Sequence, residues 1–479
     1  MMAVKSPHRG LFMQKERRFS RYIGDRAFYL RLARVCLPIM LQNGITNLVS
    51  LLDNIMVGAV GTEQMSGVSI VNQLLFVFNL CIFGGLSGAG IFTAQFFGRG
   101  DEEGVRSTFR FKILLALSLF IAGLSVFSLT GERLIALYLH EGGQTGDLAA
   151  TAGYGAKYLQ IMLWGLAPFA FQQVYASTLR EGGEALVPMK AGLIAIAVNL
   201  VFNYILIFGH FGAPAMGAAG AALATVLSRY TECALIVGWT HLHAKKQPFI
   251  RGVYRTLRVP NHLTREIFTR GMPLLINEAL WSAGMATLTQ SYSIRGLATV
   301  AGLNISSTVM NLFNIIWMSM GLSVSILVGQ DLGAEAYDRA RQTVRRIMAF
   351  SVFLSLLVGG TIAVAAPLFP LLYNTTDEVR ALAAGFIRVT MLCAPLQAFS
   401  NATYFTLRAG GRTWITFLFD SAILWVLRIP IVRLLVFFTS LPVMVIFTVS
   451  ALCDLVKCAL GYVLVRRGIW VCNIVNGNS

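Results

Sequence analysis

Apolar stretches of about 20 residues recur along the whole chain, and this feature restricts its possible folds more than any other. A helix of that length crosses a hydrocarbon layer of roughly 30 Å and satisfies every backbone polar group within itself. The composition agrees, because 56% of the residues are hydrophobic, 13% are charged and the mean hydropathy is +0.66. Soluble globular chains are less apolar and carry more charge. The sequence therefore predicts an all-α membrane protein.

About twelve such stretches predict transmembrane helices in two six-helix bundles. The longest polar break, 244–266, separates six of them from the other six. The basic start leads into a first span too long for a signal peptide, so we expect this span to be retained. The predicted spans are 35–57, 68–96, 112–131, 158–179, 190–209, 216–240, 267–294, 298–329, 347–373, 383–407, 414–438 and 441–465. The expected domains are a cytoplasmic N-terminus (1–34), an N-lobe (35–243), a cytoplasmic linker (244–266), a C-lobe (267–465) and a cytoplasmic tail (466–479).

The net charge of +17 raises the question of nucleic-acid binding, which the positions of the basic residues answer. Most of the 39 Lys and Arg residues lie before the first span or in every second loop after it. The loops 58–66 and 208–217 contain none. This asymmetry follows the positive-inside rule and predicts a multi-pass protein of a bacterial inner membrane with both termini in the cytoplasm. The lipid bilayer, and no nucleic acid, is its expected partner.

The two halves share a repeat at a constant offset of 235 residues. Its matched positions are residues that membrane composition does not favour, and they include Pro38 with Pro273, Gln95-x-x-Gly98 with Gln330-x-x-Gly333, and Arg106 with Arg341. Because each half has an even number of spans, the two copies have the same orientation. Parallel repeats are common in secondary transporters, which bind a small-molecule substrate between the halves. The repeat therefore favours transport.

Acidic residues inside a span need a partner or a function, because inserting each costs about 2.5–3.5 kcal/mol. Two acids have an opposite charge three residues away on the same helix face, which predicts the local pairs Arg229 with Glu232 and Asp454 with Lys457. Three acids have no such neighbour, and these are Asp53, Glu278 and Asp420. They are the candidate functional acids.

Polar residues of the first span form one stripe. At about 100° per residue, Asp53 falls within an arc of roughly 140° that also holds Gln42, Thr46 and Ser50. Ser282 lies close to Glu278 on the seventh span by the same reasoning. We predict a polar substrate cavity lined by Gln42, Thr46, Ser50, Ser282 and Asp420. The alternative is hydrogen bonding between helices.

Two amides on the fifth span, Asn199 and Asn203, are four residues apart and share one helix face. They can hydrogen-bond a carboxylate, and bridging between helices is an equal alternative. A carboxyl shielded from water can take up a proton and release it when water or a cation reaches it. This chemistry fits cation-coupled transport.

Several functional classes have no support in the sequence. There is no G-x-x-x-x-G-K-[ST] motif for ATP hydrolysis and no nucleophilic serine elbow. The seven cysteines are scattered without a C-x-x-C pair, so we expect no metal. We predict no catalytic residue, no enzyme activity and no cofactor other than a proton or sodium ion used for coupling.

Several motifs occur in an order that is typical of one family. They are Pro38 with Leu52-Asp53-Asn54-Ile55-Met56-Val57-Gly58, Gln95-x-x-Gly98, Pro168 with Leu179-Arg180-x-Gly-Gly, Asn199-x-x-x-Asn203-Tyr204-Ile205, and Gly217-Ala218-Ala219-Gly220-Ala221-Ala222. In this order they resemble the multidrug and toxic compound extrusion transporters, over about residues 30–465. The resemblance implies two six-helix bundles in a V that export organic compounds by alternating access, in exchange for protons or sodium ions.

The resemblance also implies roles for individual residues. Asp53 would be the cation-coupling acid of the N-lobe, and Pro38 a bending point of its helix. Some members have Asp where this chain has Asn203, so Asp53 here would depend more on Asn199. Glu278 resembles the seventh-helix acid of another branch, which leaves the coupling lobe open.

The family's substrates range from drugs to metabolites, including flavin nucleotides in an enterobacterial branch. Arg428 and Arg433 in the eleventh span could accept an anionic group, and Arg433 could instead extend to the outer interface. We expect a monomer to be functional. Alternative functions are a flippase for lipid-linked precursors, from the same superfamily, and a membrane scaffold or sensor that transports nothing.

Overall fold

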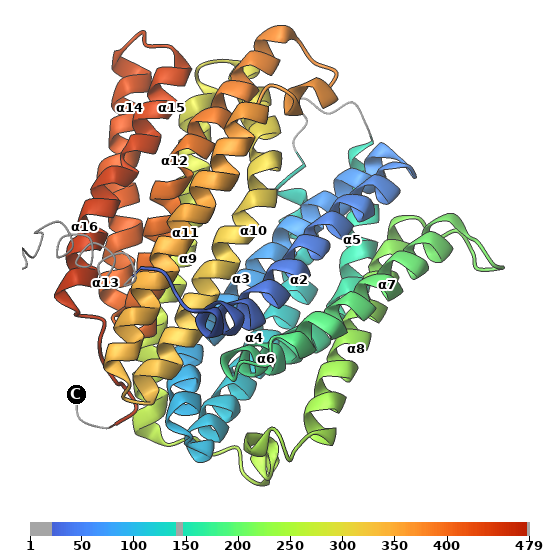
Figure 1. Ribbon diagram of the computed structural model, residues 1–479. Helices are drawn as coiled ribbons and strands as arrows, with labels where there is room; N and C mark the ends of the chain where they lie inside the picture. The colour runs from blue at the N-terminus through green and yellow to red at the C-terminus, as the bar shows by residue number, and fades with distance from the viewer. Residues whose placement is uncertain (1–21, 140–146, 477–479) are drawn as a thin grey trace, which may run out of the picture. The chain divides into compact units, whose positions relative to one another are not determined.

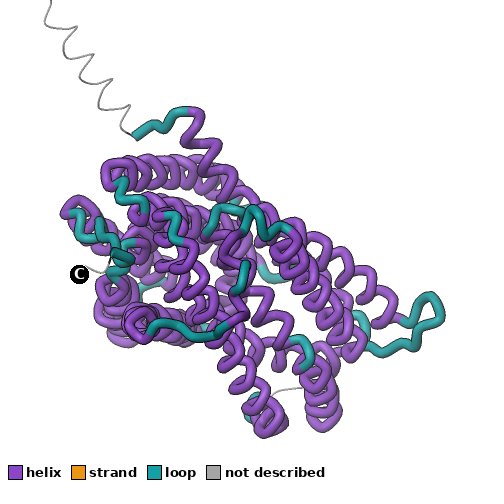
Figure 2. The backbone as a smooth tube through the Cα atoms, turned by 90° about the horizontal axis from the view of Figure 1, so that it is seen from below, coloured by secondary structure: helices purple, strands orange, loops and turns teal. Residues whose placement is uncertain are grey.

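The computed structural model describes residues 22–139 and 147–476, which form helices and loops without a strand (Figure 2). Most of the predicted cytoplasmic N-terminus and the end of the tail lie outside these residues. Contacts divide the described chain into two compact units. We call Leu37–Leu275 the N-lobe, and 22–36 together with 276–476 the C-lobe. The prediction of an all-α protein is confirmed.

The N-lobe is built from long antiparallel helices connected by short loops (Figure 1). Within it, α3 packs against α4 and α5, and α7 packs against α8. Its elements are most of α2 (Arg26–Gly58), α3 (Thr62–Arg99), α4 (Glu102–Ala136), α5 (Leu148–Leu163), α6 (Leu166–Glu181), α7 (Leu186–Phe208), α8 (Ala218–Leu242), and the short helices η1 (Pro248–Ile250) and η2 (Val253–Arg255).

The C-lobe has a second set of long helices, in which α10, α11 and α12 pack together (Figure 1). Its elements are most of α9 (Asn261–Ser293), α10 (Leu297–Gly333), α11 (Tyr337–Ala365), η3 (Phe369–Leu372), α12 (Asp377–Ala409), α13 (Thr413–Phe417), η4 (Leu418–Ala422), η5 (Leu424–Arg428), α14 (Ile429–Phe438), α15 (Val443–Leu452) and α16 (Asp454–Arg467). The elements η4 and η5 are π-helical turns.

Ten helical segments in the described residues are long and apolar enough to cross a membrane. They correspond to ten of the predicted spans, with α13 to α14 forming one segment and α15 to α16 another. The other two predicted spans are α9 and the segment 158–179.

The prediction of one continuous helix over 158–179 is wrong. The structure ends α5 at Leu163 and begins α6 at Leu166, so two shorter helices replace it. The physical reason is Pro168, whose ring nitrogen has no hydrogen to donate to the carbonyl of Trp164 and whose ring crowds that carbonyl. The Gly165 carbonyl at the break instead accepts a hydrogen bond from Arg229 of α8, at 3.2 Å.

The helices α2 and α9 each contribute to both units, which differs from the predicted division at 244–266. The first part of α2 packs in the C-lobe, where Arg31 donates to the fully buried Asp331 at 3.1 Å. The first part of α9 packs in the N-lobe, where Gly271 lies against Gly88 of α3. Both changes of unit occur within three residues of the repeat-related prolines Pro38 and Pro273, each of which lies inside its helix.

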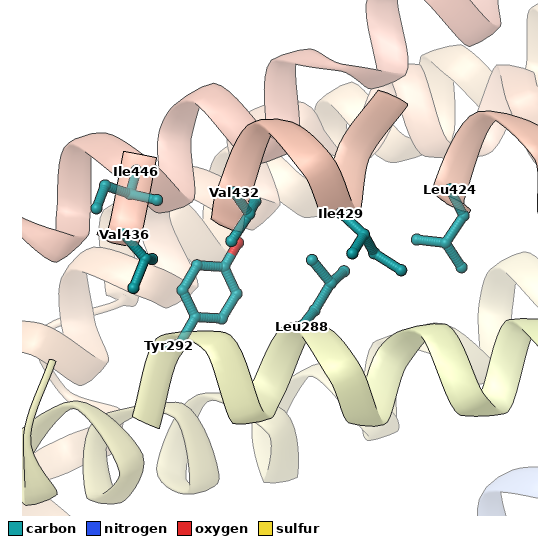
Figure 3. Packing of buried hydrophobic residues seen from close by; sticks show 7 residues of the cluster. All are labelled: Leu288, Tyr292, Leu424, Ile429, Val432, Val436 and Ile446. Atoms are coloured by element: carbon teal, nitrogen blue, oxygen red, sulfur yellow. The ribbon is translucent and has the colours of Figure 1, made fainter. Parts of the chain in front are cut away.

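An apolar core joins the second part of α9 to the last helices of the C-lobe (Figure 3). Tyr292 and Leu288 of α9 point toward α14, where Val432 is fully buried, and Ile446 of α15 closes the same cluster. These contacts hold α9 in place. They therefore also position Asn277, Glu278 and Ser282, which precede Leu288 on the same helix.

Small residues on α8 allow α7 to approach closely, as the run from Gly217 to Ala222 indicates. A Cβ atom built on Gly220 would lie 2.5 Å from the Leu206 carbonyl oxygen and 3.0 Å from the Ile207 nitrogen, both in the backbone of α7. Real Cβ atoms do not approach backbone this closely. The glycine is therefore required for the packing of these two helices.

We expect Gly220→Ala to lower the free energy of unfolding by about 1–3 kcal/mol, because α7 and α8 must move apart. Gly238 on the same helix has open space around its Cα, so Gly238→Ala is the matched control. The control should leave stability unchanged or raise it by up to about 1 kcal/mol through helix propensity. Thermal unfolding of the purified proteins in detergent measures both, and equal effects would contradict the packing role.

Candidate functional site

The carboxylate of Asp53 lies against two amides of α7. Asn203 donates to it from Nδ2 at 2.6 Å, and Asn203 is only 1% exposed. The Asn199 side chain lies 3.2 Å from the second carboxylate oxygen and donates to it when its amide nitrogen faces Asp53. The structure thus brings together the three residues that the sequence placed on two separate helices.

Thr225 of α8 completes this group, because its hydroxyl lies 3.4 Å from the Asn199 amide. Nothing in the sequence distinguishes this residue, since a lone threonine in an apolar helix usually hydrogen-bonds to its own backbone. Thr225 also does this, donating to the Ala221 carbonyl at 2.9 Å. We call Asp53, Asn199, Asn203 and Thr225 the Asp53 site.

The other predicted residues of the α2 stripe have different surroundings. Thr46 and Ser50 donate to the carbonyls one turn earlier on their own helix, at 2.8 and 3.0 Å. Gln42 is buried, and its side-chain oxygen accepts from Arg180 of α6 at 3.3 Å. Gln42 therefore belongs to a second group of polar residues in the N-lobe.

The predicted pair of Arg229 and Glu232 is not formed in the structure. Glu232 accepts instead from Gln172 of α6 at 2.8 Å. Arg229 donates to Gly165 and lies over the Phe169 ring, 4.9 Å from its centroid. The prediction was wrong because it considered only neighbours on one helix. In the structure, Arg229 hydrogen-bonds the Gly165 carbonyl at the break between α5 and α6.

In the C-lobe, Asp420 has a cationic partner on another helix, where a search for neighbours three or four residues away does not reach. Its carboxylate forms an ion pair with Lys457 of α16, and both side chains are largely buried. The predicted partner of Lys457, Asp454, instead faces Arg428 at 4.0 Å. Arg428 also donates to Ser450 of α15 at 2.9 Å. The guanidinium of Arg428, a candidate anion-binding group, therefore already has a partner on a neighbouring helix.

Asn277 connects Asp420 to its surroundings. It donates to Asp420 at 3.1 Å and accepts from Ser421 at 2.6 Å. Asp420 and Ser421 lie in the π-helical turn η4, a distortion that is frequent at functional positions in helices. Asn277 is the residue that the repeat relates to Gln42.

Glu278 lies next to Asn277 and is partly buried. Its polar neighbours are the Tyr404 hydroxyl, which hydrogen-bonds it, and the Arg408 guanidinium. Arg408 is 5% exposed and also lies over the Phe405 ring. Ser282 follows one turn later on α9 and is likewise partly buried. Asp420 thus has a cation in an ion pair, whereas Glu278 has one only within its electrostatic reach.

Comparison with known proteins identifies the family. The family model described as MatE matches residues 38–205 and 273–434, which together make up well over half of the chain. The chain belongs to the MatE family. The two matched segments begin at Pro38 and Pro273, the first pair of the predicted repeat.

Curated relatives of this MatE chain are similar over most of its length. The probable multidrug resistance protein YoeA of Bacillus subtilis is 26% identical and covers 85% of this chain and 87% of its own length. The probable multidrug resistance protein NorM of Thermotoga maritima is 25% identical, with 85% of both chains covered. The multidrug resistance protein MdtK of Photorhabdus laumondii is 26% identical, with 84% and 87% covered.

Solved structures have the same fold. A multidrug resistance MATE family transporter of the MOP superfamily, solved in an outward-facing conformation, superposes with a TM-score of 0.82. It is 19% identical, and the match covers 94% of this chain and 97% of that one. The MatE fold of a multi-pass membrane protein is therefore established for this chain.

Proposed function

We propose that this MatE protein is a secondary active exporter that removes small organic compounds from the cell in exchange for protons, with Asp53 as the coupling group. The relatives named as multidrug resistance proteins support export of drug-like compounds. The two repeated halves support alternating access between them.

One observation favours the N-lobe for coupling. Asp53 contacts neutral amides, whereas Asp420 is paired with Lys457 and Glu278 lies beside Arg408. A carboxylate without a cation beside it gains most from binding a proton in a low-dielectric interior. In the C-lobe, the charge of Asp420 is already compensated by an ion pair, and the charge of Glu278 is offset in part by Arg408.

The amide nitrogens around Asp53 disfavour a sodium ion at this carboxylate. Asn203 turns its amide nitrogen toward the carboxylate, and Asn199 does so in the amide orientation that lets it donate to Asp53. Hard cations such as sodium need several oxygen ligands instead. We therefore propose that the coupling ion is a proton, and that the transporter works without a metal or other cofactor.

The remaining parts of the proposal concern setting and partners. We place the protein in a bacterial inner membrane with both termini in the cytoplasm, as the distribution of basic residues predicts. A single chain contains both halves, so we propose a functional monomer whose partners are lipid and substrate, without nucleic acid. Flavin nucleotides are a candidate substrate class alongside organic cations.

A transport assay in proteoliposomes tests the proposal. Ethidium and FMN are loaded separately, and their movement is followed under an imposed proton gradient and, in parallel, under a sodium gradient. Proton-driven movement of at least one compound is the expected result. No gradient-driven movement of any compound by the folded protein would instead favour the flippase or the scaffold.

The variant Asn203→Asp gives a separate prediction on ion choice. It replaces an amide nitrogen by a carboxylate oxygen beside Asp53, with the Thr225 hydroxyl near by. The resulting oxygen-rich group suits a sodium ion. We expect sodium-gradient-driven export by this variant and none by the unchanged protein; equal sodium-driven rates in both would contradict the assignment of the proton.

A further inference from the structure

The segment between α8 and the first turns of α9 carries positive charge without any acid. Residues 244–265, which we call the basic segment, contain six Lys and Arg residues and no Asp or Glu, and they belong entirely to the N-lobe. All six side chains are exposed, and within the part of the chain that the structure describes none of them forms an ion pair. They are Lys245, Lys246, Arg251, Arg255, Arg258 and Arg265.

The basic segment is folded against the end of the N-lobe, where Figure 1 shows it in light green between α8 and α9. Phe249 is 1% exposed and Val253 is fully buried. The Phe249 ring lies 6.0 Å from that of Phe97 on α3 and 5.3 Å from that of Phe109 on α4, measured between centroids. The segment therefore has an apolar inner side, fixed to the helices, and a basic outer side.

Two arginines of α4 hold the backbone of the segment. Arg106 donates to the Phe249 carbonyl at 3.2 Å, and Arg110 donates to the Val253 carbonyl at 3.0 Å. Glu103 of the same helix is paired with both arginines. The charges of α4 are thus used among themselves and on the backbone, and the exposed cations of the segment are left without a counter-ion.

Membrane topology alone does not explain this arrangement. The positive-inside rule counts Lys and Arg and depends little on acids, so it requires neither the absence of acids nor an ordered backbone. Other basic helix starts of this chain contain acids that pair locally, such as Glu103 with Arg106 on α4 and Asp338 with Arg341 on α11. The unpaired cations of the basic segment therefore indicate a partner outside the chain.

Exposed apolar side chains lie among these cations and indicate what the partner is. Leu242 is 85% exposed, Tyr254 53% and Leu257 44%. Leu242 is the last residue of α8, a helix apolar enough to cross a membrane, so the segment begins where that helix leaves the lipid. Cations beside exposed apolar groups at this depth match the headgroup layer of a membrane.

The residue types fit phosphate groups. Four of the six cations are arginines, whose planar guanidinium can donate two parallel hydrogen bonds to one phosphate. Groups of four to eight Lys and Arg residues directly beside a transmembrane helix are typical of segments that bind anionic lipids.

We propose that the basic segment binds the phosphate headgroups of anionic phospholipids and so attaches this end of the N-lobe to the membrane surface. In the proposed orientation, these lipids belong to the cytoplasmic leaflet. The binding surface is new beside the proposed export function and does not depend on it.

Native mass spectrometry of the purified full-length protein in detergent counts bound lipids and tests the proposal. We expect phosphatidylglycerol to bind at least about tenfold more tightly than phosphatidylcholine with the same acyl chains. Arg251→Gln combined with Arg255→Gln should weaken binding of the tightest phosphatidylglycerol by about tenfold or more, because each cation near an anionic surface contributes roughly fivefold.

Two further double variants complete the experiment. Lys245→Gln with Lys246→Gln should also weaken phosphatidylglycerol binding, since these cations belong to the same segment. Arg133→Gln with Lys157→Gln is the matched control, because it removes two exposed cations of α4 and α5 outside the segment and should leave binding unchanged. All of these side chains are exposed, so thermal unfolding should be the same for every variant.

Three results would overturn the inference. The first is phosphatidylglycerol binding that is equal in the unchanged protein and both segment variants, and the second is equal binding of the two lipids. The third is displacement of phosphatidylglycerol by an excess of inorganic phosphate, which would make the segment a site for soluble phosphate compounds. Gradient-driven export is measured separately, so a failed exporter proposal and a failed lipid site give different results.

Discussion

Replacing Asp53 by Asn is expected to reduce proton-driven export in proteoliposomes by at least about tenfold, since coupling free energies of about 1–3 kcal/mol correspond to roughly 5- to 150-fold effects. The substitution keeps the size of the side chain and its contact with Asn203, but it removes the group that exchanges a proton. Export should then no longer respond to the imposed proton gradient. The fold should be retained, because the carboxylate contacts only neutral partners there.

Glu278→Gln is the matched comparison in the C-lobe. Glu278 has Arg408 and Tyr404 near it, and the charge of Arg408 offsets part of its own. We expect this variant to remain proton-driven. Loss of the gradient response with Glu278→Gln, but not with Asp53→Asn, would place coupling in the C-lobe and refute the assignment.

Replacing Lys457 by Met is expected to destabilise the protein by about 3–5 kcal/mol, because it leaves the Asp420 carboxylate buried without its cation. The side chains of Lys457 and Asp420 are 17% and 16% exposed, so water compensates little of this loss. Restoring neutrality with Asp420→Asn in the same chain should recover most of the stability. Thermal unfolding in detergent, converted to free energies where unfolding is reversible, measures both.

The exposed ion pair of Arg380 and Asp377 is the control for this prediction. Its aspartate is 97% exposed, and such surface pairs contribute about 0–1 kcal/mol. Arg380→Gln should therefore change stability little. If Lys457→Met were equally mild, the pair with Asp420 would have no structural importance, and Asp420 would again be a candidate residue of the substrate cavity.

Much of the fold could be predicted from sequence, because a lipid environment leaves few choices for the backbone. Apolar length predicted the spans, and the repeat was detected through residues such as Pro38 and Pro273. The break at Gly165 was missed although its signal, Pro168 three residues later, is in the sequence. Hydropathy alone does not register a proline, because it averages over the whole span.

The candidate site could be predicted only in part. Asn199 and Asn203 share a helix face by their spacing, and family resemblance associated them with Asp53. Partners on other helices could not be found this way: Lys457 lies 37 residues from Asp420, and Gln172 lies 60 residues from Glu232. Spacings of three or four residues identify partners within one helix only. Buried charged residues also pair with residues of the other helices packed around them.

The proton released on substrate binding is the most direct test of Asp53 as the coupling group. Purified protein is placed in weakly buffered detergent solution near neutral pH, ethidium is added, and a pH indicator reports the change. If proton and substrate binding oppose each other, as an antiporter requires, the unchanged protein should release up to about one proton per ethidium bound. Asp53→Asn should release none at an ethidium concentration that saturates it. Equal release by both proteins, or no release by the unchanged protein, would contradict the account.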